Sequence, residues 1–306
     1  MKYSNSRIRA AYAECRRLAT SHYENFPVAS WLVPRDKRDA LAVIYAFARC
    51  ADDFADEPGV QGRLAALADW RCRLDRCLED APEDPVFIAL ADVIERFGLT
   101  REHFHNLIRA FESDVRVNRH PDFTSLLEYC RCSANPVGRL VLELFGHHDP
   151  VLFSLSDCIC TALQLTNHWQ DVAIDLSRNR IYLPLDELAR FELSIEDLHA
   201  LTLSSEGTQS LQRRWQALMV FQVRRARQLF KEGQQLPERV VPELRLQLRL
   251  TWLGGMAILQ KIEAVNYDVF RRRPELSKFD FIQLYVKARH GLAPASNVAV
   301  VERSRT

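Results

Sequence analysis

Two pairs of aspartates are the residues in this sequence best suited to chemistry. Asp52 and Asp56 lie in the run Ala-Asp-Asp-Phe-Ala-Asp-Glu, and Asp171 and Asp175 lie in Asn-His-Trp-Gln-Asp-Val-Ala-Ile-Asp. In each pair the carboxylates are four residues apart, which places both on one face of a helix. Carboxylate oxygens are ligands that Mg²⁺ prefers, and Mg²⁺ often completes its shell with phosphate oxygens. Two such pairs facing across a cavity would bind divalent metal and a diphosphate.

Each pair belongs to a longer polar stripe on its helix. At about 100° per residue, four members of each stripe fall within about 60°, and Asn167 lies about 40° beyond the edge of the second. The first stripe consists of Tyr45, Arg49, Asp52 and Asp56, and the second of Gln164, Asn167, His168, Asp171 and Asp175. Two amphipathic helices with solvated acidic faces are the alternative. Such faces usually carry Lys and Glu, whereas these carry Tyr, Arg, Gln and Asn, which favours a site.

This combination indicates chemistry that ionises an isoprenoid diphosphate. Arg49 supplies a cation that cannot deprotonate, and Arg180 could reach the same phosphates, although it could equally be an ordinary arginine at a helix end. A carbocation must then be shielded from water by apolar and aromatic walls. The candidates for these walls are Phe26, Phe47, Phe54, Tyr129 and Tyr267. For the phenylalanines, packing in the core is the stronger alternative.

Hydrophobic periodicity predicts helix in nearly every segment and no strand. The predicted helices cover residues 7–22, 35–57, 60–80, 85–97, 101–118, 123–132, 137–146, 151–176, 186–191, 195–201, 209–234, 241–269 and 278–289. Pro58-Gly59 should end the second helix, and Asn135-Pro136 should break the chain between two others. We therefore expect one all-α domain over residues 1–290, with about a dozen helices around a central cavity. Residues 291–306 are expected to form a flexible tail.

Composition excludes several other classes of protein. The 306 residues carry a net charge of +1, which argues against a general nucleic-acid surface. The eight cysteines include no Cys-x-x-Cys pair, which favours free thiols in a reducing compartment over a metal site or a disulfide framework. The sequence shows no apolar signal segment and no run long enough to span a bilayer. We expect a cytoplasmic protein that a lipid substrate brings transiently to the inner membrane surface.

Four motifs in this order resemble those of the squalene and phytoene synthase family. Residues 45–57 resemble its first aspartate-rich motif, and residues 164–175 followed by Arg-Ile-Tyr-Leu-Pro resemble its second. The motif between them corresponds to Tyr129-Cys130 with Val137-Gly138, and residues 263–273 resemble the C-terminal Tyr/Arg segment. The resemblance extends over about residues 15 to 290. It implies an isoprenoid synthase fold and Mg²⁺-dependent chemistry on prenyl diphosphates.

Carried over position by position, the resemblance assigns roles to residues already singled out. The metal ligands would be Asp52, Asp56, Asp171 and Asp175. Together with His168 from the second stripe, the expected catalytic residues are Tyr45, Arg49, Tyr129 and Asn167. The residues expected to bind substrate are Arg49, Gln164, Asn167, Arg180, Tyr267 and Arg273.

Two short signatures narrow the expected reaction. Residues 23–30, Tyr-Glu-Asn-Phe-Pro-Val-Ala-Ser, and residues 133–139, Ser-Ala-Asn-Pro-Val-Gly-Arg, resemble the hopanoid-pathway branch of the family. That branch converts presqualene diphosphate to hydroxysqualene. The diphosphate leaves, the cation rearranges, and water captures it. Asn135 or His168 could hold that water, although a structural kink and a structural histidine are equally plausible for these positions.

Other reactions share the same aspartate pairs. Presqualene diphosphate synthase, phytoene synthase and dehydrosqualene synthase all condense two prenyl diphosphates, and only residues 23–30 and 133–139 argue against them. A non-catalytic relative that serves as an assembly factor would be expected to lose its metal ligands, whereas all four aspartates are present here. Enzymes of neighbouring pathway steps are further possible partners.

Overall fold

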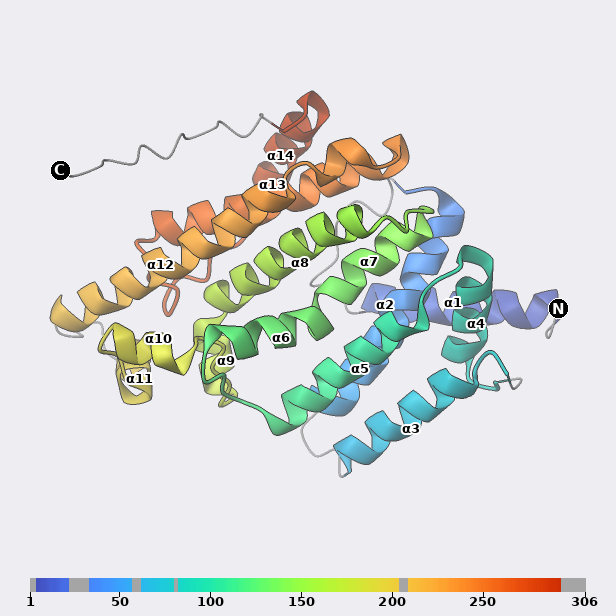
Figure 1. The fold of residues 1–306 in the computed structure, drawn as a ribbon, viewed down its shortest axis with the longest axis horizontal. Helices are drawn as coiled ribbons and strands as arrows, with labels where there is room; N and C mark the ends of the chain where they lie inside the picture. The colour runs from blue at the N-terminus through green and yellow to red at the C-terminus, as the bar shows by residue number, and fades with distance from the viewer. Residues whose placement is uncertain (1–3, 22–32, 57–61, 80–81, 204–208, 293–306) are drawn as a thin grey trace, which may run out of the picture.

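The fold is all-α, as the computed structural model shows in Figure 1. It describes residues 4–21, 33–56, 62–79, 82–203 and 209–292, apart from the side chains of Ser21 and Asp56. The helices are α1 (Asn5–Ser21), α2 (Arg35–Asp56), α3 (Arg63–Arg76), α4 (Pro85–Phe97), α5 (Arg101–Arg116), α6 (Phe123–Ser133), α7 (Asn135–Leu144), α8 (Pro150–Gln170), α9 (Val172–Ser177), α10 (Leu185–Arg190), α11 (Ile195–Leu203), α12 (Gln209–Gly233), the short 3₁₀ helix η2 (Leu236–Arg239), α13 (Pro242–Ala264) and α14 (Lys278–His290). Within these residues there is no strand, and a single bridge joins Arg119 to Ile181.

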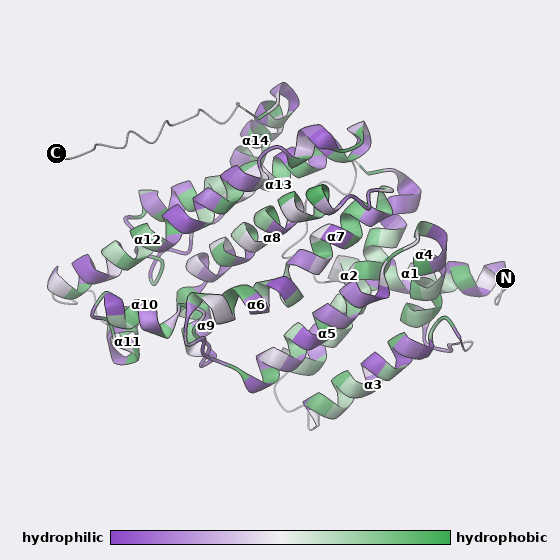
Figure 2. Cartoon of the chain, viewed as in Figure 1, coloured by the Kyte–Doolittle hydropathy of each residue, from purple (hydrophilic) through white to green (hydrophobic). Residues whose placement is uncertain are grey.

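Helix α8 lies at the centre of the molecule. It packs between α12 and α7 and also contacts α6 and α13, as Figure 1 shows. Its inward face buries Leu165 and Trp169 completely. Within the same continuous core, the part formed by α2, α3, α4 and α5 centres on Phe47, whose ring lies 5.2 to 6.1 Å from those of Trp70, Phe87 and Phe104. Hydrophobic and polar residues share most helices, as Figure 2 shows, which is typical of helices with one face in a core.

Local sequence explains where several helices begin and end. Asp84 and Asp149 cap α4 and α8 by accepting the backbone N–H two residues on, and a proline follows each of them. Gly98 ends α4 with φ 66°, a left-handed conformation that glycine adopts without steric cost. Each predicted helical segment is helical. The break predicted at Asn135-Pro136 lies one residue earlier, at Ala134, because Asn135 and Pro136 form the first turn of α7, where proline is tolerated.

Most helix boundaries differ from the prediction by a few residues, and two predicted helices differ further. The segment 151–176 is not one helix, because the backbone at Asp171 (φ −104°, ψ 13°) separates α8 from α9. The segment 241–269 ends early, at Ala264, because Asn266 and Tyr267 adopt φ values of 54° and 62°. The predicted tail falls almost wholly outside the described residues, which end at residue 292.

Candidate functional site

The first polar stripe lies at the C-terminal end of α2. Arg49 Nη1 donates to Asp52 Oδ2 at 2.9 Å, and Arg49 Nη2 lies 2.6 Å from Asp53 Oδ1. The spacings are i,i+3 and i,i+4, so the helix itself brings these charges together. All three side chains are about one-third exposed, at 32%, 31% and 28%. Tyr45 lies one turn earlier and is partly buried, and the side chain of Asp56 lies outside the described residues.

The second stripe follows α8 across its junction with α9. The Asp171 N–H donates to the Asn167 carbonyl, and the Asp175 N–H donates to the Asp171 carbonyl, both at 2.9 Å. The two aspartates therefore remain one helical turn apart despite the break. The pKa of Asp175 is raised to about 7, first by burial and then by the charges on Asp171 and Asp114, while Arg180 and Arg178 act to lower it. Burial and neighbouring carboxylates therefore outweigh the nearby arginines in their effect on the pKa of Asp175.

Arg273 reaches this junction from the segment between α13 and α14. Its Nε lies 2.6 Å from Asp171 Oδ1 and its Nη2 lies 3.2 Å from Asp171 Oδ2, although 102 residues separate the two. The buried Gln170 side chain donates to the Pro274 carbonyl, and Arg273 Nη1 also bonds to Glu275 at 2.5 Å. These contacts hold the segment against the α8–α9 junction. The Arg273 guanidinium therefore lies on Asp171, a carboxylate that was predicted to bind metal.

A network of aromatic rings and one carboxylate adjoins the second stripe. Asp114, near the end of α5, accepts the Tyr129 hydroxyl at 3.1 Å and the Tyr182 hydroxyl at 3.4 Å. The His168 ring stacks on Tyr182 with centroids 3.7 Å apart and planes at 16°. His168 Nε2 lies 3.2 Å from the side-chain nitrogen of Gln164. Helices α5, α6 and α8, together with the loop that carries Tyr182, therefore fix the orientation of these rings.

The same network keeps its rings neutral. Burial, with a smaller contribution from His120, lowers the pKa of His168 to about 3, so its imidazole is uncharged at neutral pH. Burial also raises the pKa of Tyr129 and of Tyr182 well above that of a free phenol, and Asp114 adds to both effects. The structure thus places neutral ring faces beside a cluster of carboxylates and arginines.

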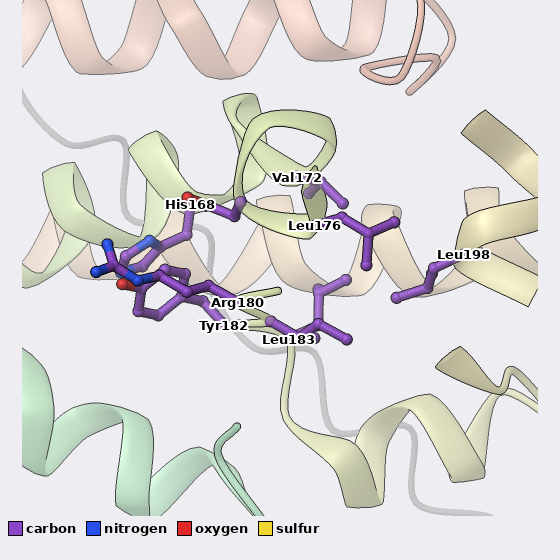
Figure 3. Close-up of a pocket in the computed structure, with 9 residues that line it drawn as sticks. His168, Val172, Leu176, Arg180, Tyr182, Leu183 and Leu198 are labelled. Atoms are coloured by element: carbon purple, nitrogen blue, oxygen red, sulfur yellow. The ribbon is translucent and has the colours of Figure 1, made fainter. Parts of the chain in front are cut away.

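A narrow pocket of about 10 Å³, roughly the space that one water molecule needs, lies at this junction. Figure 3 shows the side chains of His168, Arg180 and Tyr182 gathered at one end and those of Leu183 and Leu198 at the other. Asp175 also contributes to the lining. The pocket therefore has a polar end, with His168, Asp175 and Arg180, and an apolar end lined by leucines.

Two members of this network were not predicted from the sequence. Tyr182 lies in the motif Arg-Ile-Tyr-Leu-Pro, but no role was assigned to it. Asp114 follows no recognisable motif, and only its contacts with Tyr129 and Tyr182 identify it. Its position near the end of α5, in a segment rich in charges, carried no distinguishing signal in the sequence.

Other residues singled out from the sequence lie in the core, take part in helix–helix contacts or fall outside the described residues. Phe47 is fully buried among other rings in the core, as the alternative for the phenylalanines predicted. The His168 ring contacts the side chains of Gln164 and Tyr182. The Asn135 side chain accepts the Thr161 hydroxyl at 3.0 Å, so it links α7 to α8. Phe26 and the signature at 23–30 lie outside the described residues.

Three further predicted site residues occupy different surroundings. The Asn167 side chain is exposed beside Asp171 and forms no hydrogen bond within the described part of the chain. Arg180 lines the pocket, and its N–H donates to the Asp175 carbonyl at 2.8 Å. Tyr267 lies at the end of α13 beside Glu263, which is paired with Arg227 of α12. The structure therefore brings Arg180 and Arg273 to the second aspartate pair, whereas Tyr267 belongs to the α12–α13 contact.

The donor chemistry of the site fits a hard divalent cation. Between them, Asp52, Asp171 and Asp175 supply only oxygen ligands, and the repulsion at Asp175 is of the kind that a bound cation relieves. Among the described side chains, no group of three or more acidic, histidine or cysteine residues already converges on a metal position. Arg49 and Arg273 instead neutralise the carboxylates of Asp52 and Asp171.

Comparison with known proteins gives consistent matches. The family model for squalene/phytoene synthase matches residues 19–280. A 15-cis-phytoene synthase from Synechococcus elongatus is 33% identical over 278 residues, covering 86% of this chain and 87% of the relative. A hydroxysqualene synthase from Zymomonas mobilis is 37% identical over 206 residues, covering 62% of this chain and 68% of the relative.

The fold also matches a solved structure. The crystal structure of squalene synthase HpnC from Alicyclobacillus acidocaldarius superposes with a TM-score of 0.79 at 39% identity, covering 86% of this chain and 97% of that one. The predicted all-α isoprenoid synthase fold is thereby confirmed. No helix in the described residues has the length and apolar character needed to cross a bilayer.

Proposed function

Because the chain belongs to the squalene/phytoene synthase family, whose members act on prenyl diphosphates, we propose that it is an Mg²⁺-dependent hydroxysqualene synthase. The substrate would be presqualene diphosphate and the product hydroxysqualene. The observation that carries the proposal is the α8–α9 junction itself, where Asp171, Asp175 and two arginines lie beside the neutral rings of His168 and Tyr182. The Zymomonas mobilis relative and the signature at 133–139 support the choice of reaction.

The charged end would hold the diphosphate. Asp52, Asp56, Asp171 and Asp175 would hold Mg²⁺, which when bound would neutralise negative charge on the departing diphosphate. Arg180 already lines the pocket, and Arg273 already lies on Asp171, so both guanidiniums are close enough to bind phosphate oxygens. Arginine suits this role because its planar fork binds phosphate through two N–H groups and stays charged.

The neutral rings would face the carbocation. When the carbon–oxygen bond breaks, the diphosphate takes the electron pair and leaves a cation on the carbon chain. Ring faces attract a cation without trapping it covalently, and Asp114 orients the rings of Tyr129 and Tyr182 through their hydroxyls. After rearrangement a water oxygen bonds to the cation and loses one proton. With a pKa of about 3, His168 is too weak a base for that proton, which we assign to the diphosphate.

Product analysis by mass spectrometry tests the assignment. Purified protein with Mg²⁺ would receive presqualene diphosphate, farnesyl diphosphate or geranylgeranyl diphosphate, each with and without NADPH. The proposal predicts hydroxysqualene from presqualene diphosphate alone, at a rate independent of NADPH. Squalene formed only with NADPH would instead indicate a reductive terminal step, and no turnover of presqualene diphosphate would overturn the proposal.

A condensing synthase is the second candidate. It is favoured by the longer match to the Synechococcus elongatus phytoene synthase, which spans 278 residues. This enzyme would join two prenyl diphosphates head to head at the same aspartates. Phytoene made from geranylgeranyl diphosphate, or presqualene diphosphate made from farnesyl diphosphate, would support it over the first proposal.

A further inference from the structure

Helix α14 carries an exposed apolar stripe. In the described part of the chain, eight large hydrophobic side chains are exposed, and four of them belong to this one helix. Phe279, Ile282 and Val286 are 67%, 63% and 51% exposed, and Phe281 beside them is 43% exposed. The spacing of the first three places them within about 60° of one another on the helix. The opposite face, with Leu284 and Ala288, is buried.

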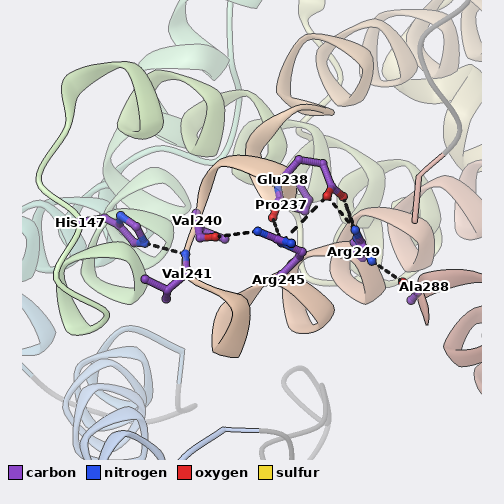
Figure 4. Close-up of polar contacts among 8 residues, drawn as sticks. All are labelled: His147, Pro237, Glu238, Val240, Val241, Arg245, Arg249 and Ala288. Carbon is purple, nitrogen blue, oxygen red and sulfur yellow. Dashed lines mark hydrogen bonds and ion pairs between the residues drawn. The ribbon is translucent and has the colours of Figure 1, made fainter. Parts of the chain in front are cut away.

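The rest of the molecule holds α14 in a fixed orientation. Ser277 and Asp280 form a capping box at its start, and Lys261 of α13 pairs with Asp280 at 3.0 Å. At its other end, Arg249 Nη1 donates to the Ala288 carbonyl at 3.1 Å while its Nε and Nη2 donate to Glu238 at 2.7 Å, as Figure 4 shows. Both ends of α14 are thus fastened to α13, and the helix lies at the edge of the molecule (Figure 1). Its apolar stripe is therefore held exposed to solvent.

Positive charge borders the stripe on both sides. On the helical wheel Lys278 and Arg289 lie on one side of it and Lys287 on the other. All three side chains are exposed, and none forms an ion pair within the described residues. The acidic residue of this helix, Asp280, is already paired with Lys261. An apolar stripe between lysine and arginine side chains is the pattern of a helix that lies in a membrane interface.

We propose that α14 docks this protein on anionic lipid. Phe279, Ile282 and Val286 would enter the boundary between head groups and acyl chains, and the three cations would bind lipid phosphates. A second copy of this chain is a poorer occupant of the same surface. Two-fold pairing of the helix would bring the cations of one copy close to those of the other, which is unfavourable.

Helix α14 lies close in sequence to a residue of the candidate site, so docking of α14 would also position the site. Arg273 is fixed on Asp171, and Phe279 follows it by six residues, so their Cα atoms are separated by at most about 20 Å. Docking would therefore bring the α8–α9 junction close to the lipid surface. The docking itself does not depend on which prenyl diphosphate reacts there, and it is measured without substrate.

Vesicle flotation tests the proposal. The full chain would be mixed with vesicles of phosphatidylcholine, with or without phosphatidylglycerol, and we expect binding that requires the anionic lipid and weakens with salt. The variant Phe279→Ser with Ile282→Ser should lose roughly tenfold or more in apparent affinity, because it removes most of the inserted apolar area. The matched control is Val151→Ser with Leu203→Ser, which removes two exposed apolar residues from other helices and should bind as the parent does.

Three further measurements keep the proposal falsifiable. Circular dichroism and thermal unfolding should match the parent for both double variants, because the replaced side chains are exposed. The variant Lys278→Glu with Lys287→Glu should lose the preference for anionic vesicles. Unchanged flotation of the Phe279→Ser, Ile282→Ser variant would overturn the proposal, as would loss of flotation when residues 293–306 alone are removed. So would a concentration-dependent dimer that does not bind vesicles and that the Phe279→Ser, Ile282→Ser variant breaks.

Discussion

At the scale of single residues, the site is a set of carboxylates and arginines that influence one another. Besides burial, the charges on Asp171 and Asp114 raise the pKa of Asp175, and those on Arg180 and Arg178 lower it. Arg273 lies directly on Asp171. Each of these residues therefore influences how strongly its neighbours bind a proton, a metal ion or a phosphate. Three predictions follow from the particular contacts.

Asp114 should be a positioning residue for the rings of Tyr129 and Tyr182. In Asp114→Asn one tyrosine hydroxyl would face an amide N–H rather than an acceptor, so the rings would lose their fixed orientation. We expect kcat to fall roughly 10- to 100-fold with a small change in KM, equivalent to about 1–3 kcal/mol. The acid limb of the pH–rate profile should also move to lower pH, because Asp114 contributes to the raised pKa of Asp175.

Glu112 supplies a matched control on the same helix. It pairs with Arg71 of α3 at 2.7 Å, away from the tyrosines. Glu112→Gln should leave both kcat and the acid limb unchanged. If Asp114→Asn behaved like this control, Asp114 would have no positioning role.

Arg273 should compete with metal in the absence of substrate. Its guanidinium now occupies the oxygens of Asp171, so metal must displace it. In Arg273→Gln, the affinity for Mg²⁺ alone should rise several-fold, whereas the affinity for a prenyl diphosphate analogue should fall, because a phosphate ligand is lost. Isothermal titration of each ligand separates the two effects. Arg271→Gln, which removes an exposed arginine paired with Asp268, is the control. A variant that loses affinity for both ligands would contradict this competition.

Metal binding should depend on pH through Asp175. Its pKa is raised from 3.8 to about 7, so the folded, metal-free protein holds a proton there that the unfolded chain has released. Between pH 3.8 and about pH 7, the free energy of unfolding of the metal-free protein therefore decreases as the pH rises. Above about pH 7 this contribution to stability is lost completely. Because only the carboxylate binds metal, Mg²⁺ affinity should fall by up to tenfold per pH unit below about pH 7.

Calorimetry in buffers of different ionisation enthalpy would measure the protons released on binding Mg²⁺. Near neutral pH we expect a fraction of a proton per protein, absent in Asp175→Asn. Equal release by the parent and this variant would show that another group titrates.

At the scale of helices, close packing around α8 depends on small residues. A Cβ added at Gly233, the last residue of α12, would lie 2.7 Å from the Leu155 carbonyl oxygen of α8 and would also collide with Ile159. Because a backbone carbonyl in a helix cannot move aside, Gly233→Ala should destabilise the fold by about 1–3 kcal/mol. Gly254 of α13 is the control, since only Leu276 lies near its Cβ position, at 3.7 Å.

Chemical denaturation would measure both glycine variants. Gly254→Ala should be neutral or stabilise by up to about 1 kcal/mol, because alanine has the higher helix propensity. Equal stability of the two variants would mean that α12 and α8 can move apart at no cost.

The helices could be predicted well from the sequence because their signals are local. Asp84-Pro85 and Asp149-Pro150 mark helix starts wherever the rest of the chain lies. The break at Asp171 could not be predicted in this way. The run 151–176 keeps helical periodicity throughout, and the contacts that occupy the break come from Arg273 and Pro274, more than 100 residues later.

At the scale of the whole molecule, the site is assembled from segments that are distant in sequence. Family motifs identified the aspartates, Arg49 and Arg180 without any knowledge of the packing. Asp114 could not be found in this way, because its importance lies in two contacts, one of them with a residue 68 positions later. The apolar stripe of α14 was also hidden, since helical periodicity does not show which face of a helix the rest of the molecule covers.

The central claim is that this molecule breaks the bond to diphosphate and lets water capture the cation. The most direct measurement is turnover of presqualene diphosphate with Mg²⁺ in ¹⁸O-labelled water, followed by mass spectrometry of the product. We predict hydroxysqualene that carries one ¹⁸O atom per molecule, and no product from Asp171→Asn. An unlabelled alcohol, or a hydrocarbon product in place of the alcohol, would contradict the account.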